Sequence, residues 1–197
     1  MTAATRIIGI DPGLTRCGIG VVTAGRGRNV TFEHVEVLRS AADAPVTERI
    51  LRIGASIERI VDGEGIGAIA LERVFAQQNL PSVMGVAQIS GVVMFLAAKR
   101  GIPVTLYTPN EVKSQVTGYG AADKTQVGQM VARLLRLDAP PSPADASDAL
   151  ALAVTHAWNL NRGTAPGAAS SPTETPAQRA WREAERTARR GGPTRRT

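Results

Sequence analysis

Apolar residues follow two spacings along the chain, one typical of strands and one typical of helices. Near the N-terminus, three short runs rich in β-branched residues are separated by turns that contain glycine; they cover residues 6–11, 18–23 and 30–38. Runs of this length joined by short turns predict an antiparallel meander. The next run, residues 47–63, places an isoleucine at every third or fourth position and therefore predicts a helix.

Strands and helices alternate in the rest of the chain. Residues 67–72 and 103–109 predict two short buried strands, with a long apolar helix over 81–100 between them. Two helices then start with a capping-box pattern, Thr108 with Glu111 and Asp123 with Gln126. A last helix is predicted over residues 142–160. This order predicts an α/β fold, a mixed sheet flanked by helices on both faces.

The C-terminal residues differ from the rest in composition. From residue 163 onward the chain is poor in large apolar residues, rich in Pro, Gly, Ala, Ser and Thr, and carries seven Arg against three Glu. We therefore expect one folded domain over residues 1–162 and a disordered basic tail over 163–197, either a solvated tail or a loose electrostatic arm. Of the net charge of +6, the tail holds +4, so composition alone does not make the folded part a nucleic-acid binder.

The helix expected over residues 81–100 carries no charge in its first eighteen residues. Its serines, its glutamine and its small residues argue against a membrane span, and an apolar helix in a small soluble protein needs cover on two sides. We therefore predict a homodimer built on this helix, with burial inside one chain as the alternative. The single cysteine, Cys17, and the lack of a cleavable apolar segment after "MTAATR" favour a cytoplasmic protein.

Carboxylates stand where buried elements end or begin. Asp11 ends the first strand before Pro12 and Gly13, and Glu72 ends the apolar strand "AIAL". Asp145 and Asp148 are three residues apart, which places them on one face of the last helix. Neighbouring strand ends can bring such carboxylates within a few ångströms of one another.

Like charges this close repel unless a cation lies between them, and oxygen ligands without a Cys or His cluster favour Mg²⁺ or Mn²⁺. Each acid also has a structural interpretation. Asp11 before Pro-Gly fits a turn, Glu72 could pair with Arg73, and the two aspartates of the last helix could cap it or favour its dipole.

Four stretches in order resemble the RuvC family of Holliday-junction resolvases, within the RNase H-like nuclease superfamily. They are "IGIDPGLTRCGIGVV", "AIALERVFAQQN", "TPNEVKSQVTGYGAADKTQV" and "PADASDALALAVTHAW", and the match spans about residues 6–160. The resemblance implies an RNase H-like sheet and four catalytic carboxylates that bind two Mg²⁺ ions, for which Mn²⁺ can substitute. These carboxylates fall on Asp11, Glu72, Asp145 and Asp148, of which the third is the least uniform in the family.

The resemblance also implies a substrate and partners. The substrate is a four-way DNA junction, nicked in two strands of like polarity by a homodimer to leave 5′-phosphate and 3′-hydroxyl ends, in recombination and repair. Phe75 matches an aromatic residue that intrudes among bases, and Lys113 and Lys124 match basic positions near the cut strand. A core phenylalanine and solvated lysines are the structural alternatives. The family works with the RuvA–RuvB branch-migration complex.

Three other functions start from the same residues. "DPGLT" also fits loosely the phosphate loop of actin-like ATPases such as sugar kinases, but those proteins need a second lobe for which this chain is too short. An RNase H-like nuclease acting on another nucleic acid, such as an RNA–DNA hybrid, is the closer rival. A junction-binding protein without catalysis is the third, and the presence of all four acids argues against it.

Overall fold

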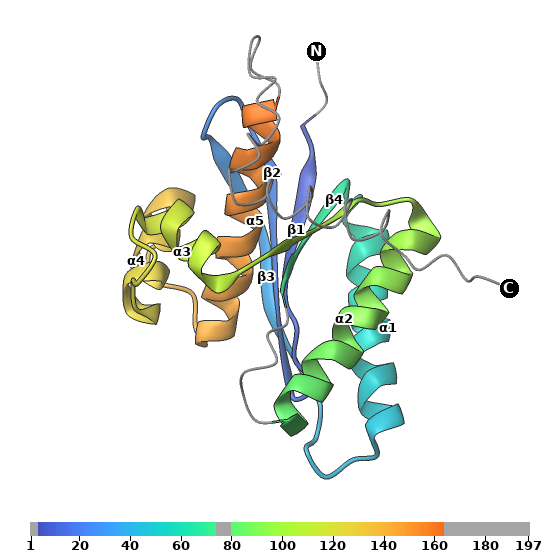
Figure 1. Ribbon diagram of the computed structural model, residues 1–197. Helices are drawn as coiled ribbons and strands as arrows, with labels where there is room; N and C mark the ends of the chain where they lie inside the picture. The colour runs from blue at the N-terminus through green and yellow to red at the C-terminus, as the bar shows by residue number, and fades with distance from the viewer. Residues whose placement is uncertain (1–3, 74–79, 164–197) are drawn as a thin grey trace, which may run out of the picture. The chain divides into compact units, whose positions relative to one another are not determined.

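The computed structural model describes residues 4–73 and 80–163. Within these ranges, three strands are followed by two helix–strand pairs and then by three helices (Figure 1). Their bounds are β1 (Arg6–Asp11), β2 (Arg16–Ala24), β3 (Val30–Arg39), α1 (Val46–Gly63), β4 (Ala68–Glu72), α2 (Leu80–Arg100), β5 (Val104–Tyr107), α3 (Pro109–Thr117), α4 (Lys124–Leu135) and α5 (Ala144–Gly163). Phe75 and the predicted tail beyond Gly163 lie outside the described residues.

The strands form one mixed sheet in the order β3-β2-β1-β4-β5. β1, β2 and β3 are antiparallel to their neighbours in the meander, whereas β4 pairs in parallel with β1, and β5 pairs in parallel with β4. The predicted meander and the predicted α/β fold are therefore confirmed. β2 begins at Arg16, two residues before the predicted start, because pairing with the end of β3 extends the ladder.

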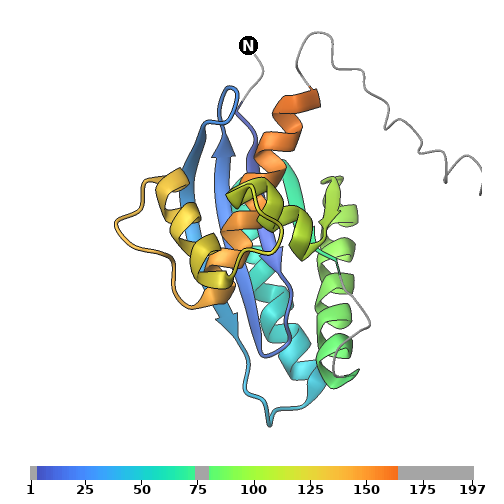
Figure 2. The same cartoon turned by 60° about the vertical axis from the view of Figure 1, so that its left-hand side comes forward.

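Helices cover both faces of the sheet, each over its own hydrophobic core. Figures 1 and 2 show α1 and α2 side by side on one face and α3, α4 and α5 on the other. On the first face, the buried Ile57 of α1 and Ile89 of α2 belong to one core with Ile8 of β1. On the second face, Ile7 of β1 packs in a separate core with Leu150 of α5. Successive side chains of β1 point to opposite faces of the sheet, so the strand contributes residues to both cores.

The starts of α3 and α4 follow the predicted capping boxes. The Thr108 hydroxyl accepts the Glu111 N–H at 3.2 Å, and the Glu111 carboxylate accepts the Thr108 N–H at 2.7 Å. Asp123 and Gln126 repeat this exchange at the start of α4, at 2.8 and 3.0 Å. These caps fix where each helix starts, and therefore where Lys113 and Lys124 lie.

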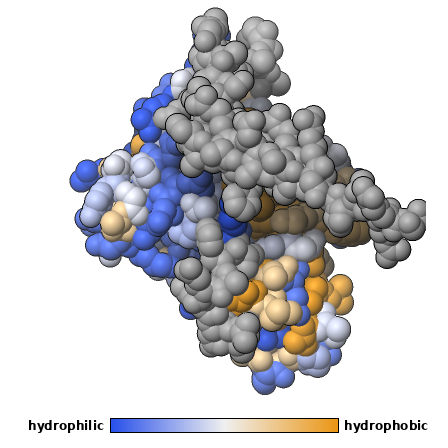
Figure 3. All heavy atoms as spheres, in the orientation of Figure 1, coloured by the Kyte–Doolittle hydropathy of each residue, from blue (hydrophilic) through white to orange (hydrophobic). Residues whose placement is uncertain are grey.

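α2 is covered by the protein on one side and leaves apolar side chains exposed on another. Ile89 is fully buried, whereas Met84, Met94 and Phe95 are 57%, 42% and 65% exposed. Figure 3 shows apolar residues gathered on the α1–α2 side of the visible surface and hydrophilic ones over α3 and α4. Among the described residues, Ser82–Arg100 is the one stretch long and apolar enough to cross a membrane by length and composition, and 33% of it is buried.

Candidate active site

The acids that end β1 and β4 lie next to each other. The two strands are parallel neighbours, with Ile10 opposite Leu71 one residue before the acids. Both of those residues are fully buried beneath α1 and α2, so alternation turns Asp11 and Glu72 to the other face, towards α5. There the two carboxyl groups share a hydrogen bond. The predicted approach of these two acids is present in the structure.

Asp11 carries the most perturbed carboxyl group of the site. Burial raises its pKa to about 9, and the hydrogen bond and charge of Glu72 add to the rise, followed by the charges of Asp148 and Asp145. Without a cation, burial and the neighbouring carboxylates therefore favour the protonated form of Asp11. A divalent cation bound here would neutralise the negative charge that the three neighbouring carboxylates place around Asp11.

The other two acids reach Asp11 because α5 lies directly on the backbone of β1 and β2. Gly18 is the partner of Asp11 in the β1–β2 ladder. A Cβ added at Gly18 would collide with the Asp145 carbonyl group, with the carbonyl carbon at 2.8 Å, and one at Gly9 would collide with the Ala149 carbonyl oxygen. Glycine at these positions lets the first turns of α5 settle against the strands that hold Asp11.

Each acid of α5 is ion-paired with a basic side chain. Asp145 Oδ2 lies 3.0 Å from Nε of Arg16, at the start of β2. Asp148 Oδ2 accepts a hydrogen bond of 2.9 Å from Nζ of Lys124, at the start of α4. That hydrogen bond is the largest contribution to the raised pKa of Lys124. The sequence left helix capping open for both acids; in the structure their carboxylates pair with bases from β2 and α4.

A pocket of about 380 Å³ opens between the sheet edge and the helices of this face. Three predicted acids and both predicted lysines line it, together with apolar side chains; the full lining is Asp11, Glu72, Pro109, Val112, Lys113, Lys124, Val127, Asp148 and Leu152. Asp145 is not in this lining and lies next to it, bound to Arg16. The structure thus brings together five of the seven predicted site residues, with Asp145 beside them.

The donor chemistry of the pocket fits a hard divalent cation. All four acids offer oxygen atoms, which Mg²⁺ and Mn²⁺ prefer. Within residues 4–73 and 80–163, no three His, Cys, Asp or Glu side chains already stand in an arrangement that could hold a metal ion. In the structure as it stands, Asp145 is ion-paired with Arg16 and Asp148 with Lys124. A cation bound by all four acids would have to replace both ion pairs.

The residues that sequence reasoning missed are Arg16 and Tyr107. Arg16 lies five positions after Asp11, a spacing that in a tight hairpin returns the chain to the same end of the sheet. Tyr107 aligns with Glu72 in the β4–β5 ladder. Its hydroxyl lies 2.8 Å from Nδ1 of His156, which is buried and whose pKa is lowered by that burial. His156 is thus buried behind Tyr107 and is held by its hydroxyl.

A five-stranded mixed sheet with acids at two adjacent strand ends, met by a helix that brings two more, defines an RNase H-like nuclease fold. The family model described as "Crossover junction endodeoxyribonuclease RuvC" matches residues 7–156. The chain belongs to this RuvC family. Family membership makes it a metal-dependent endonuclease and decides against the actin-like ATPase and the non-catalytic junction binder.

Individual relatives agree over most of the chain. A crossover junction endodeoxyribonuclease RuvC from Leifsonia xyli subsp. xyli is 52% identical over 195 residues, which cover 94% of each chain. The protein of the same name from Streptomyces griseus subsp. griseus is 58% identical over 153 residues, covering 78% of this chain and 75% of the relative. The structure of Thermus thermophilus RuvC in complex with a Holliday junction substrate matches with a TM-score of 0.76 and 35% identity, covering 81% of this chain and 97% of that one.

Proposed function

We propose that this chain resolves Holliday junctions by nicking two strands of like polarity, leaving 5′-phosphate and 3′-hydroxyl ends, in recombination and DNA repair. The observation that carries the proposal is the pocket in which Asp11, Glu72 and Asp148 face Lys113 and Lys124. Acids and bases lining one pocket suit a substrate that is itself an anion and needs a cation to be cut. The complex of the Thermus relative with a Holliday junction supports the choice of substrate.

The four acids divide the work of holding divalent cations. Asp11 and Glu72 stand on the ends of a buried sheet, so their positions are rigid, whereas Asp145 and Asp148 stand on the first turns of α5. Two Mg²⁺ ions, or Mn²⁺ in their place, would activate water and stabilise the leaving oxygen when bound there. Lys113 and Lys124 hold phosphates of the cut strand in line with the acids.

A symmetric substrate needs two linked active sites, and α2 offers the surface that links them. Met84, Met94 and Phe95 are exposed on α2, and their spacing keeps them on one side of the helix. A second copy of the chain, packed against this face, would bury them and place one site on each protomer. The protein acts as a homodimer in this proposal, while Ile89 and Val93, on another side of α2, stay buried in the core against the sheet.

The remaining expectations rest on the family resemblance for Phe75 and the branch-migration partner, and on sequence composition for the tail and the location. Phe75, in the segment that follows Glu72, would stack on an unpaired base at the centre of the junction. The tail over 163–197 would add affinity for DNA by charge, beyond a folded domain that ends at residue 162. We assign the protein to the cytoplasm and to work with the RuvA–RuvB branch-migration complex.

The test incubates the protein with a synthetic four-way junction and Mg²⁺, next to linear duplex and RNA–DNA hybrid. We expect paired nicks in the junction and little cutting of the controls. Asp11→Asn should bind the junction and leave it intact. Glu33→Gln is the matched control, because Glu33 is exposed on β3 and the new amide keeps an acceptor for the Thr23 hydroxyl.

Two results would contradict the proposal. Equal cutting of junction, duplex and hybrid would show a nuclease that does not select four-way junctions. Substantial nicking by Asp11→Asn would remove this residue from the cation site.

A further inference from the structure

Two arginines face each other at the end of the sheet next to the candidate active site. Arg16 begins β2, Arg39 ends β3, and the two are direct partners in the antiparallel ladder. Their neighbours Cys17 and Leu38 are buried in the core beneath α1 and α2, so both arginines project on the face that carries α5. Like charges directly opposite each other destabilise a pair of strands. An anion bound between them would relieve that repulsion.

Neither arginine uses its full hydrogen-bonding capacity within the protein. Nε of Arg16 binds Asp145, while 56% of the Arg16 side chain is exposed. The contact leaves the remaining N–H donors of the guanidinium available to solvent. The Arg39 side chain is exposed and, in the part of the chain that the structure describes, makes no hydrogen bond or ion pair. Arg49, the next basic residue in the sequence, instead donates hydrogen bonds to the hydroxyl groups of Ser40 and Thr15.

The order of the strands places this pair on one side of the acids. Along the sheet edge, Arg39 on β3 is followed by Arg16 on β2, Asp11 on β1 and Glu72 on β4. Adjacent strands are about 4.8 Å apart, so Arg39 lies about 10 Å across the sheet from the strand of Asp11. Lys113 and Lys124 come from α3 and α4, outside the sheet. A DNA strand crossing the acids would therefore meet basic side chains in the acidic pocket, Lys113 and Lys124, and two more beside it, Arg16 and Arg39.

We propose that Arg16 and Arg39 form a second phosphate-binding site for the substrate strand, on the β2–β3 side of the acidic pocket. This inference rests on the proposed junction substrate. Guanidinium groups bind phosphate through two parallel N–H donors, which a single exposed ammonium cannot do. The ion pair with Asp145 keeps Arg16 turned towards the acids before a cation binds. A cation that takes up Asp145 frees Arg16 to hold the phosphate next to the one that is cut. Arg39 holds the following phosphate.

The experiment measures junction binding in EDTA by fluorescence anisotropy, so that cleavage does not enter the readout. Affinity is followed between about 50 and 200 mM salt, because each phosphate contact adds about one to the slope of log K against log salt. Arg16→Gln and Arg39→Gln should each weaken binding on the order of tenfold and lower the slope by about one. The double variant should lower it by about two. Arg16→Lys should keep the slope near that of the unmodified protein.

Arg26→Gln is the matched control, since it removes the same charge from the turn between β2 and β3. That turn is roughly 30 Å from Arg16 along the strand. Thermal melting of each variant checks the fold. Arg39→Gln separates the proposal from a purely structural role of Arg16, because Arg39 has no contact with Asp145.

The second phosphate site would be overturned if the slope of log K against log salt for Arg16→Gln and for Arg39→Gln equalled that of Arg26→Gln. Failure of the unmodified protein to bind the junction would instead contradict the proposed function.

Discussion

The helices α5 and α2 cover opposite faces of the same sheet in opposite ways. α5 meets β1 and β2 backbone to backbone at Gly9 and Gly18, and it carries two acids to the strand ends. α2 is buried on one side and leaves Met94 and Phe95 exposed on another, and a Cβ at its Gly91 would meet nothing within 4 Å. The position of α5 is therefore fixed by direct backbone contact with the sheet, whereas α2 leaves one face open to solvent.

This difference separates two requirements of one protein. Carboxylates that share a cation need positions fixed to a fraction of an ångström, which close packing on glycine provides. An interface with another copy needs apolar area, which α2 provides without a demanding fit to its own sheet. Changes that disturb α5 should therefore affect chemistry and stability, and changes on the exposed face of α2 should affect association.

The largest effect is expected at Asp11 in the absence of metal. Its pKa of about 9 in the folded chain lies above the ordinary value, so the folded state holds a proton that the unfolded state releases. The stability of the unmodified protein therefore falls as pH rises from about 4 towards 9. Asp11→Asn lacks this loss. In urea unfolding with EDTA, its advantage should grow by about 1 kcal/mol per pH unit, roughly 3 kcal/mol from pH 5 to pH 8.

Addition of Mg²⁺ should reduce that advantage, because a cation favours the ionised carboxylate. An advantage that does not change with pH would show that Asp11 titrates at its ordinary value, and it would remove the electrostatic contrast between the α5 face and the rest of the sheet.

A pair of glycine substitutions tests the packing contrast directly. Gly18→Ala places a methyl group against the Asp145 carbonyl and should displace the start of α5, with a loss of about 2 kcal/mol of stability and on the order of 100-fold in junction cleavage. Gly91→Ala meets nothing within 4 Å in its own chain and should stabilise α2 in the isolated protomer by about 0.5–1 kcal/mol, because only a second copy packs on this face of the helix. Urea unfolding and single-turnover cleavage measure both. Equal effects of the two substitutions would mean that α5 adapts as easily as α2.

The elements and the acids followed from local patterns, whereas the partners of the acids did not. Strand ends at Asp11 and Glu72 can be read from apolar runs, and the caps at Thr108 and Asp123 from residue types three positions apart. These signals lie within a few residues along the chain. They were sufficient for the order of the elements and for the approach of two strand ends.

The ion pair between Arg16 and Asp145 joins residues far apart along the chain, and so does the pair between Lys124 and Asp148. Nothing local encodes either contact, because each depends on how closely α5 settles on the sheet. The sequence left open that Asp145 caps the last helix; its carboxylate instead pairs with Arg16. The close approach at Gly18 that produces this geometry is equally a tertiary effect.

Phe95→Glu tests the exposed face of α2 by adding charge to the proposed interface. Phe95 is 65% exposed, so the folded protomer should tolerate the change, while burial of an unpaired carboxylate should weaken the dimer by about 2 kcal/mol, roughly 30-fold. Leu160→Glu on α5, where Leu160 is 38% exposed, is the matched control. Sedimentation equilibrium gives the dimer constants. A Phe95→Glu dimer as stable as that of the unmodified protein would move the interface away from α2.

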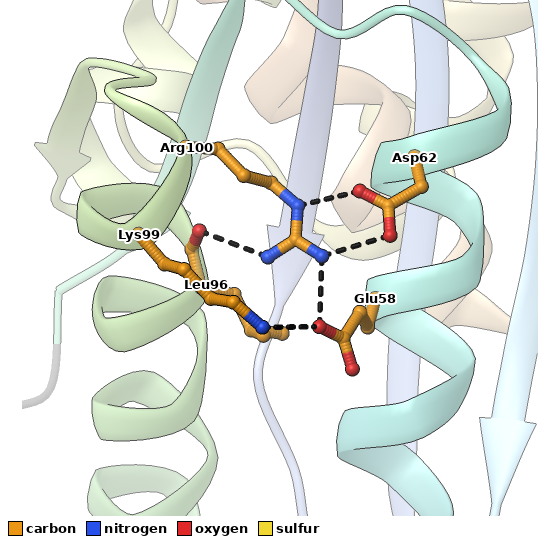
Figure 4. A network of polar contacts seen from close by, with 5 residues as sticks. All are labelled: Glu58, Asp62, Leu96, Lys99 and Arg100. Atoms are coloured by element: carbon orange, nitrogen blue, oxygen red, sulfur yellow. Dashed lines mark hydrogen bonds and ion pairs between the residues drawn. The ribbon is translucent and has the colours of Figure 1, made fainter.

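The smallest effect is expected where α2 is tied to α1 by charge. Figure 4 shows the Arg100 guanidinium between Asp62 and Glu58, with contacts of 2.5 to 2.8 Å, and Lys99 beside Glu58. Hydrogen bonds from Arg100 lower the pKa of both carboxyl groups, but the carboxylates are exposed, so solvent and salt screen the attraction. Arg100→Gln should therefore lower Tm by roughly 2 °C at low salt and by less at high salt. Arg59→Gln is the control and should change Tm less, because the Arg59 side chain is 72% exposed on α1. If the loss of Tm in Arg100→Gln does not depend on salt, then packing of the arginine stem, and not its charge, holds α2 against α1.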